Sequence, residues 1–275
     1  MSIVNYFGGQ DLIRVIDAYL RQEEVRVELV VCNNSSGSDL EAKNRYSSEG
    51  RVVWLEPGIN LGFSVGHNRA MNVLMLSEVD FIVCSNFDIT FNAMFLRDLT
   101  RIYVKNKVNG ILAPLNINPN KDSFWRYPSA LRLVASHCFI GNSLVKITGM
   151  KITDIQGIFA VDCVSGGCFI VNKTVWNELG GFHNDYFLYS EELYLYQRLR
   201  ELNLKMYVTA EVKYSHGDGD DQNSYEQLST LKRHLYNSRR LHLSLFHHPL
   251  YCHLLDCVHN IHLLELKILS WLKKD

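Results

Sequence analysis

The segment Phe81-Ile82-Val83-Cys84-Ser85-Asn86-Phe87-Asp88 is the one from which the fold of this chain can be worked out. Four apolar residues run directly into a polar stretch that ends in a carboxylate. An apolar run of this length between polar residues is typical of a strand buried on both faces, as in a parallel sheet. Ligands of such sheets bind beyond the carboxyl ends of the strands, where Asp88 is expected. A turn or helix cap would also explain Asn86 and Asp88, so the neighbouring segments must decide.

Segments of strand and helix character alternate through residues 1–113. The expected strands are 1–4, 27–31, 52–55, 81–84 and 110–113. Between the first two, apolar residues recur at helical spacing at Leu12, Val15, Ile16 and Tyr19. This alternation predicts right-handed βαβ units and therefore an α/β fold with a doubly wound sheet.

The second half of the chain is less regular at first. Residues 114–160 contain three prolines and predict a long excursion of the kind that shapes a binding site. Strand character returns at 161–171, and a helix is expected from Lys173 to Leu179, ended by Gly180-Gly181 in the left-handed region. A further helix over 191–202 and a strand over 205–208 complete the expected domain.

Composition and charge exclude several classes of protein. The chain has 275 residues, 47% of them hydrophobic, and a net charge of -1, which gives no basic footprint for nucleic acid. Its seven cysteines contain no Cys-x-x-Cys pair, which favours a reducing compartment. The sequence has no secretory signal and no apolar window of membrane-spanning length, so we expect a cytoplasmic protein.

From residue 224 onward the pattern is helical. Apolar residues fall near one helical face, and the chain ends with Trp271 and Lys273-Lys274. Such a face can dock on the domain itself, on a partner subunit or second copy, or on a membrane surface. We therefore expect a domain of residues 1–223 and a helical extension of residues 224–275. Residues 250–275 are the segment expected to contact the inner face of the plasma membrane or a partner.

Four segments, in order and with the expected spacing, resemble the inverting family 2 glycosyltransferases of the GT-A fold, particularly the rhamnosyltransferase-like branch. They are similar to that branch's VNYNG, NxGFxxGxNxG, NPDI and GGFDExFFLYxEDxDLxxR motifs. The matching residues are 3–9 (IVNYFGG), 60–70 (NLGFSVGHNRA), 85–89 (SNFDI) and 180–192 (GGFHNDYFLYSEE) with Arg198. The resemblance covers residues 1 to about 245 and implies a mixed sheet with a Rossmann-like nucleotide-binding half.

The chain departs from the family pattern at several acidic positions. Cys32 and Gly37 stand where the family's DNxSxD segment has its two Asp residues, and Tyr194 replaces a third. We expect base recognition to move to Asn33 or Asn34, whose amides can pair with an imide edge.

The resemblance implies a divalent cation, Mg²⁺ or Mn²⁺, and a dTDP- or UDP-sugar donor. Asp88 is the expected metal ligand, with His216 as a second group that reaches the metal or the diphosphate. A hydrogen-bonding structural role is the alternative for His216. The residues expected to bind the donor are Asn5, Tyr6, Asn33, Asn34, Gly62, Gly66, Asn68, Asn86, Gly166, Gly167 and Arg239. Ordinary turn and strand-packing duties would equally explain the glycines.

Two adjacent carboxylates are candidates for the general base. By motif position Glu192 matches the family's catalytic Asp, and Glu191 would orient the acceptor or the helix. Acidic residues also favour the first turn of a helix for electrostatic reasons, which is the structural alternative for one of the pair.

Together these features predict a metal-dependent, inverting glycosyltransferase. The resemblance favours transfer of L-rhamnose from dTDP-rhamnose to a hydroxyl of a growing surface polysaccharide or lipid-linked glycan, with UDP-hexoses and galactofuranose as alternatives. A nucleotidyltransferase would need a basic glycine-rich loop after the first strand, and residues 5–9 contain no Lys or Arg. An inactive glycosyltransferase-like subunit that binds a partner remains the non-enzymatic alternative.

Overall fold

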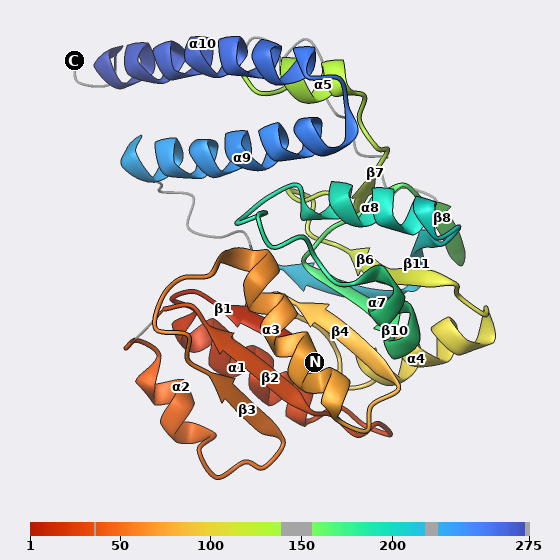
Figure 1. The fold of residues 1–275 in the computed structure, drawn as a ribbon. Coiled ribbons are helices and arrows are strands. Elements are labelled where there is room, and N and C mark those ends of the chain that lie inside the picture. Colours follow the sequence, from red (N-terminus) through yellow and green to blue (C-terminus); the bar gives the residue numbers. More distant parts are fainter. Residues whose placement is uncertain (36, 139–155, 218–224, 273–275) are drawn as a thin grey trace.

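The protein is a mixed α/β domain beneath a layer of two long helices, as seen in a computed structural model (Figure 1). The structure describes residues 1–35, 37–138, 156–217 and 225–272. Within them, nine strands form one sheet in the order β3-β2-β1-β4-β10-β6-β11-β5, with β8 paired to β11. A separate two-stranded ribbon joins β7 to β9.

The strands of the first half are parallel to one another and those of the second half are mixed. β1, β2, β3 and β4 run parallel, β10 is antiparallel to both β4 and β6, and β6 is parallel to β11. The strands are β1 (Ser2–Asn5), β2 (Leu29–Asn33), β3 (Val52–Leu55), β4 (Phe81–Ser85), β5 (Ile89–Thr90), β6 (Gly110–Asn116), β7 (Phe124–Trp125), β8 (Ile158–Val161), β9 (Cys163–Val164), β10 (Cys168–Asn172) and β11 (Lys205–His216).

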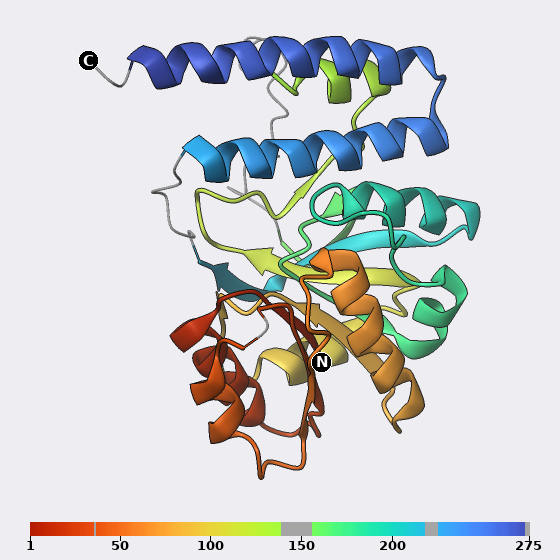
Figure 2. The ribbon, with the colours of Figure 1, turned by 60° about the vertical axis from the view of Figure 1, so that its left-hand side comes forward.

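Helices cover both faces of the sheet (Figures 1 and 2). One face packs against α1 (Gly9–Leu20), α2 (Leu40–Arg45) and α4 (Phe95–Lys105). The other packs against α3 (Gly62–Leu76), α7 (Lys173–Leu179) and α8 (Glu191–Glu201). Within β4, Val83 faces the first core and Ile82 the second, so the strand is buried on both sides as its sequence predicted.

Most predicted elements are present, with small shifts at their ends. The helix expected at 173–179 has these bounds, because Asn172 accepts a hydrogen bond from the Thr174 N–H and Gly180 ends the helix at φ +74°. The last predicted strand, 205–208, instead continues to His216. The excursion at 114–160 contains β7 and α5 (Ala130–Ala135), and residues 139–155 lie outside the described part.

The C-terminal helices α9 (Tyr225–Phe246) and α10 (Leu250–Leu272) run side by side above the sheet domain. A third core joins α5, α8, α9 and α10, and includes Leu133, Leu193, Leu243 and Leu255. One face of α10 therefore docks on the chain itself. No helix in the described ranges has the length and apolarity needed to cross a bilayer.

Candidate active site

A cavity of about 480 Å³ opens between the sheet, α8 and α9. It brings together seven of the residues singled out from the sequence: Asn86, Gly166, Gly167, Glu191, Glu192, His216 and Arg239. They come from five different elements or loops. The two that lie furthest apart in the sequence, Asn86 and Arg239, are separated by 153 positions. Asp88 lies beside the cavity, with its Oδ1 3.1 Å from the Nε2 of His216.

The backbone before α8 is strained in a way that fixes both glutamates. Tyr189 and Ser190 adopt φ values of +72° and +66°, which non-glycine residues rarely take. Ser238 of α9 holds this turn by donating a hydrogen bond to the Leu188 carbonyl oxygen at 2.8 Å. Backbone strain of this kind costs of order 1–3 kcal/mol and persists only where the surroundings enforce it. Here it places the first turn of α8, with Glu191 and Glu192, at the wall of the cavity.

The two glutamates differ in their surroundings. Glu191 is 4% exposed and its Oε1 has no hydrogen-bond partner among the described residues, whereas half-buried Glu192 accepts a bond from the Gly166 N–H at 3.1 Å. Burial raises the pKa of both carboxyls, and the charge of Glu192 raises that of Glu191 further, well above its usual value. This arrangement favours a protonated Glu191, so Glu192 is the better candidate of the two for an ionised base.

Gly166 and Gly167 leave room for their neighbours. A Cβ on Gly166 would lie 2.9 Å from Glu192 Oε1, and one on Gly167 would lie 2.9 Å from the Tyr214 hydroxyl and 3.0 Å from His216 Nδ1. The Gly167 carbonyl oxygen also accepts a hydrogen bond from the Asn86 N–H. The pair of glycines thus allows the ends of β4, β11 and α8 to approach one another.

Asp88, His216 and Asn86 form the group that could hold a cation. His216 Nε2 is 3.1 Å from Asp88 Oδ1 and 2.9 Å from Asn86 Nδ2. Neighbouring ligands of six-coordinate Mg²⁺ lie about 3 Å apart when each is about 2.1 Å from the metal, so this spacing fits two ligands of one ion. No cluster of three or more His, Cys, Asp or Glu side chains with metal-binding geometry occurs in the described ranges. A cation here would therefore depend on phosphate oxygens and water for its remaining ligands.

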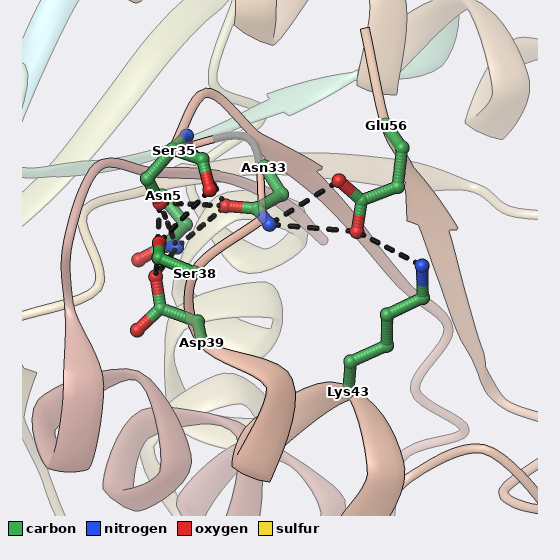
Figure 3. A network of polar contacts seen from close by, with 7 residues as sticks. All are labelled: Asn5, Asn33, Ser35, Ser38, Asp39, Lys43 and Glu56. Carbon is green, nitrogen blue, oxygen red and sulfur yellow. Dashed lines mark hydrogen bonds and ion pairs between the residues drawn. The ribbon is translucent and has the colours of Figure 1, made fainter. Parts of the chain in front are cut away.

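At the carboxyl ends of β1 and β2, buried Asn5 and Asn33 belong to one hydrogen-bond network (Figure 3). Asn5 Nδ2 donates to Asn33 Oδ1 at 2.9 Å and to Asp39 Oδ2 at 2.9 Å. Burial would raise the pKa of Asp39, but bonds from Asn5, Ser38, the Gly9 N–H and Ser35 lower it. Asn33 Nδ2 donates toward Glu56, which also pairs with Lys43. Asn5 therefore shapes this loop. Both the oxygen and the nitrogen of the Asn33 amide have partners among the described residues, and its contact with the base stays a prediction.

Four other residues expected to bind the donor lie outside the cavity and have structural partners. Asn34 donates from Nδ2 to the Gly62 carbonyl oxygen, and Gly66 packs so closely that a Cβ would lie 2.8 Å from Val4. Asn68 donates to the Phe182 carbonyl oxygen and to Asn184. A Cβ on Gly62 would lie 2.3 Å from the Phe187 carbonyl oxygen. Close packing and loop docking give each of these residues a structural role, and their expected contacts with the donor stay a prediction.

Tyr6 remains accessible, with 51% of its surface exposed next to this network. Its ring makes an edge contact with that of Phe7, which has a positive φ of 54° and is 64% exposed. Exposed aromatic faces at the end of β1 are suited to stacking on a base.

Several residues of the site escaped the sequence reasoning. Asp39 supplies a carboxylate two positions after Gly37, where the family motif has its second Asp, and Glu56 closes the other side of the network. Asp122, Trp125 and Leu235 line the cavity. Asp39 could have been found from the sequence, because it lies two positions after the place where the family motif has an Asp. No local feature of the sequence marks Asp122 or Leu235.

Comparisons with known proteins agree with this geometry. No family model matches the chain. It is 25% identical over 230 residues to the low-salt glycan biosynthesis hexosyltransferase Agl10 of Haloferax volcanii, covering 82% of this chain and 68% of that protein. It is 26% identical over 247 residues to the N-acetylglucosaminyl-diphospho-decaprenol L-rhamnosyltransferase of Mycobacterium tuberculosis, covering 81% of this chain and 78% of that protein.

Among solved structures, the chain resembles residues 1–349 of S. aureus TarS in complex with UDP. The TM-score is 0.52 at 13% identity, over 87% of this chain. The match spans 64% of the TarS chain, which is less than two thirds of its length. The sequence relatives and the fold together confirm the resemblance seen in the motifs: this chain is similar in sequence to glycosyltransferases, a rhamnosyltransferase among them, and has the mixed α/β fold of a GT-A glycosyltransferase.

Proposed function

We propose that the protein is an inverting glycosyltransferase that moves a sugar from a nucleotide donor to a hydroxyl of a lipid-linked glycan. The observation that carries the proposal is the meeting, in one cavity, of the Asn86–His216 pair with the Glu191–Glu192 pair. Inversion requires a base that activates the acceptor on the side of the anomeric carbon opposite to the leaving group. The two pairs of residues lie on different walls of the same cavity, which suits this requirement. The named activities of the two sequence relatives support a transferase of this class.

In this proposal Glu192 removes the proton of the acceptor hydroxyl as that oxygen attacks the anomeric carbon. The Gly166 N–H orients its carboxylate. Protonated Glu191 is placed to donate a hydrogen bond to the acceptor. The base of the donor would lie against Tyr6 and the loop held by Asn5, Asn33 and Asp39, at the ends of the parallel strands.

We further propose that Asp88 and His216 hold Mg²⁺ or Mn²⁺, with the Asn86 amide beside it. Such an ion would neutralise the charge that develops on the departing diphosphate. The Asn86 nitrogen faces His216 in this structure, and a half-turn of the amide would present its oxygen to the cation. Replacement of Asp88 by Asn is expected to remove the effect of the metal on nucleotide affinity. Isothermal titration with UDP and dTDP, with and without Mg²⁺, measures this directly.

For the donor we propose dTDP-L-rhamnose, on the strength of the motif resemblance and the rhamnosyltransferase relative. A panel of dTDP- and UDP-sugars with Mg²⁺ or Mn²⁺ tests this by thermal unfolding. A ligand that binds only the folded state raises the unfolding midpoint, and the true donor should raise it most. If no nucleotide sugar raises the midpoint, the glycosyltransferase proposal fails in favour of a non-catalytic binding subunit. A larger effect of a UDP-hexose would replace the rhamnose assignment.

The outer face of α10 is proposed to contact an anionic membrane surface. Leu250, Leu254, Ile261, Leu264 and Ile268 are 39–59% exposed along this face. The two acids of α10, Asp256 and Glu265, lie 2.9 Å from Arg240 and His262, so their carboxylates are paired within the molecule. An apolar stripe without exposed carboxylates suits anionic lipid, and an acceptor on a lipid would lie at such a surface.

Vesicle flotation tests the membrane proposal. The full chain should float with vesicles containing phosphatidylglycerol, and the double variant Ile261→Glu/Leu264→Glu should not. Substitution is preferable to removal of α10, because the opposite face of α10 completes the third core. If the variant instead converts a dimer to a monomer in light scattering and flotation is unchanged, the stripe is an interface between two copies.

A further inference from the structure

The walls of the cavity belong to different layers of the molecule. Asn86 and His216 come from the sheet, Glu191 and Glu192 from the start of α8, and Leu235 and Arg239 from α9. Figures 1 and 2 show α8 between the sheet and α9. The glutamates therefore lie between a polar wall, where the donor diphosphate is proposed to bind, and a second wall to which β7, α5, the segment before α8 and α9 contribute.

The second wall is largely apolar and carries one cation, and the Asp122 carboxylate also lines the cavity. Its lining side chains are those of Trp125, Pro128, Leu133, Leu188 and Leu235, together with the guanidinium of Arg239. Apolar side chains around a positive group suit a ligand that combines a hydrocarbon part with a negative charge, because the few polar groups of a site fix the orientation of its ligand.

Among the described residues, no carboxylate forms an ion pair with Arg239. Its Nη1 donates a hydrogen bond to the Leu133 carbonyl oxygen at 3.2 Å. Its neighbour Arg240, on the outer side of the helix, pairs with Asp256 at 2.9 Å. Burial lowers the pKa of Arg239 to about 10 without a compensating acid. A guanidinium carries five N–H donors, so the bond to Leu133 leaves Arg239, which lines the cavity, with further donors for a ligand.

We propose that Arg239 binds the phosphate or diphosphate group of a lipid-linked acceptor, and that the apolar wall contacts the first part of the lipid. This inference rests on the proposed function and names the chemical class of its acceptor. The planar guanidinium matches two phosphate oxygens at once, which a lysine cannot do. Because α8 lies between the sheet and α9, the acceptor sugar would lie at Glu192, and the phosphate bound to Arg239 would lie on the side of Glu192 away from the donor.

Binding of farnesyl diphosphate provides a test that does not depend on the acceptor sugar. The full chain is first saturated with dTDP or UDP, whichever binds, and Mg²⁺, so that the donor site is filled. Quenching of tryptophan fluorescence then reports binding near Trp125, with farnesol as the uncharged probe. We expect Arg239→Gln to weaken farnesyl diphosphate binding about ten- to hundredfold, as for loss of hydrogen bonds to a charged group. Farnesol binding should be unchanged.

Two further variants separate this role from a loss of folding. Arg240→Gln removes a charge from the next position outside the cavity and should leave both affinities unchanged. Arg239→Lys keeps the charge and should give an intermediate affinity. Thermal unfolding of each variant verifies that the fold is retained.

The outcomes distinguish this inference from the proposed function. If wild type binds nucleotide but not farnesyl diphosphate, or if Arg239→Gln leaves farnesyl diphosphate binding unchanged, the inference is overturned and the transferase proposal stands. If the variant weakens dTDP or UDP binding instead, Arg239 serves the donor and the inference is again wrong. If no nucleotide or nucleotide sugar binds, the proposed function itself fails.

Discussion

At the scale of single residues, the adjacent glutamates are expected to divide two roles. Glu192→Gln removes the proposed base and should lower kcat by 10²–10⁴ with little change in donor affinity. Glu191→Gln mimics the protonated carboxyl that burial favours, so it should retain activity within about tenfold. Steady-state kinetics measures kcat of both variants, and titration with the donor measures their affinity for it. The reverse pattern would assign the base to Glu191.

The same pair predicts the acid limb of the pH profile. Burial raises the pKa of Glu192 above the ordinary carboxyl value of 4.5. A base works only when deprotonated, so kcat/KM should fall as the pH decreases through this raised pKa. The midpoint of the acid limb should therefore lie clearly above 4.5. A midpoint at or below that value would indicate an exposed base, contrary to the cavity seen here.

At the scale of elements, the turn that carries the glutamates depends on the start of α3. Gly62 has φ +76°, and the Phe63 N–H donates to the Phe187 carbonyl oxygen at 2.7 Å. Gly62→Ala would bring a Cβ within 2.3 Å of that oxygen and displace the segment leading to Glu191.

We expect Gly62→Ala to cost about 1–3 kcal/mol of unfolding free energy. It should also reduce kcat more than it weakens nucleotide binding, because the displaced turn carries the base. Urea unfolding and kinetics measure the two effects. Gly50→Ala is the matched control, since a Cβ at that position has nothing within 4 Å. Equal effects of the two substitutions would contradict the docking argument.

At the scale of the whole molecule, three buried histidines should make the fold sensitive to acid. Burial lowers the pKa of His67, His137 and His242 from 6.5 to about 3. Below pH 6.5 these imidazoles bind protons in the unfolded chain but stay neutral in the folded chain. Stability is therefore lost as the pH falls, by about 1.4 kcal/mol per pH unit for each histidine until the folded pKa is reached.

Urea unfolding between pH 7 and pH 4 measures this slope. The variant His67→Gln should lower the number of protons taken up on unfolding by about one, and should reduce the slope accordingly. His253→Gln, at an exposed position of α10, should leave the slope unchanged. A flat stability profile over this interval would show that the three imidazoles are accessible to protons in the folded state.

The helical extension is also an integral part of the molecule. His242 of α9 lies between the Tyr127 and Tyr186 hydroxyls, at 2.6 and 3.0 Å, and Arg239 lines the active-site cavity. The division into residues 1–223 and 224–275 stays a prediction about chain organisation. The shared third core shows that the described part of the extension packs against the first segment.

The sequence by itself determined the parts that depend on local pattern. The apolar run before Asp88 predicted a strand buried on both faces, and Asn172 and Gly180 predicted the ends of α7, because strand burial and helix caps are properties of a few neighbouring residues. The motif order likewise predicted the GT-A fold. The presence of Asn86, Glu192 and His216 in one cavity agrees with the site expected from those motifs.

Only the tertiary structure decided which groups are already satisfied. Asn34, Gly66 and Asn68 look like nucleotide contacts in the motif, but their partners come from distant loops and strands that no local pattern names. Asp39 enters the network through a positive φ of 58°, and Arg239 enters the cavity through the packing of α9 above α8. Hydrogen-bond satisfaction and burial of charge depend on contacts across the chain, so they become visible only once it is folded.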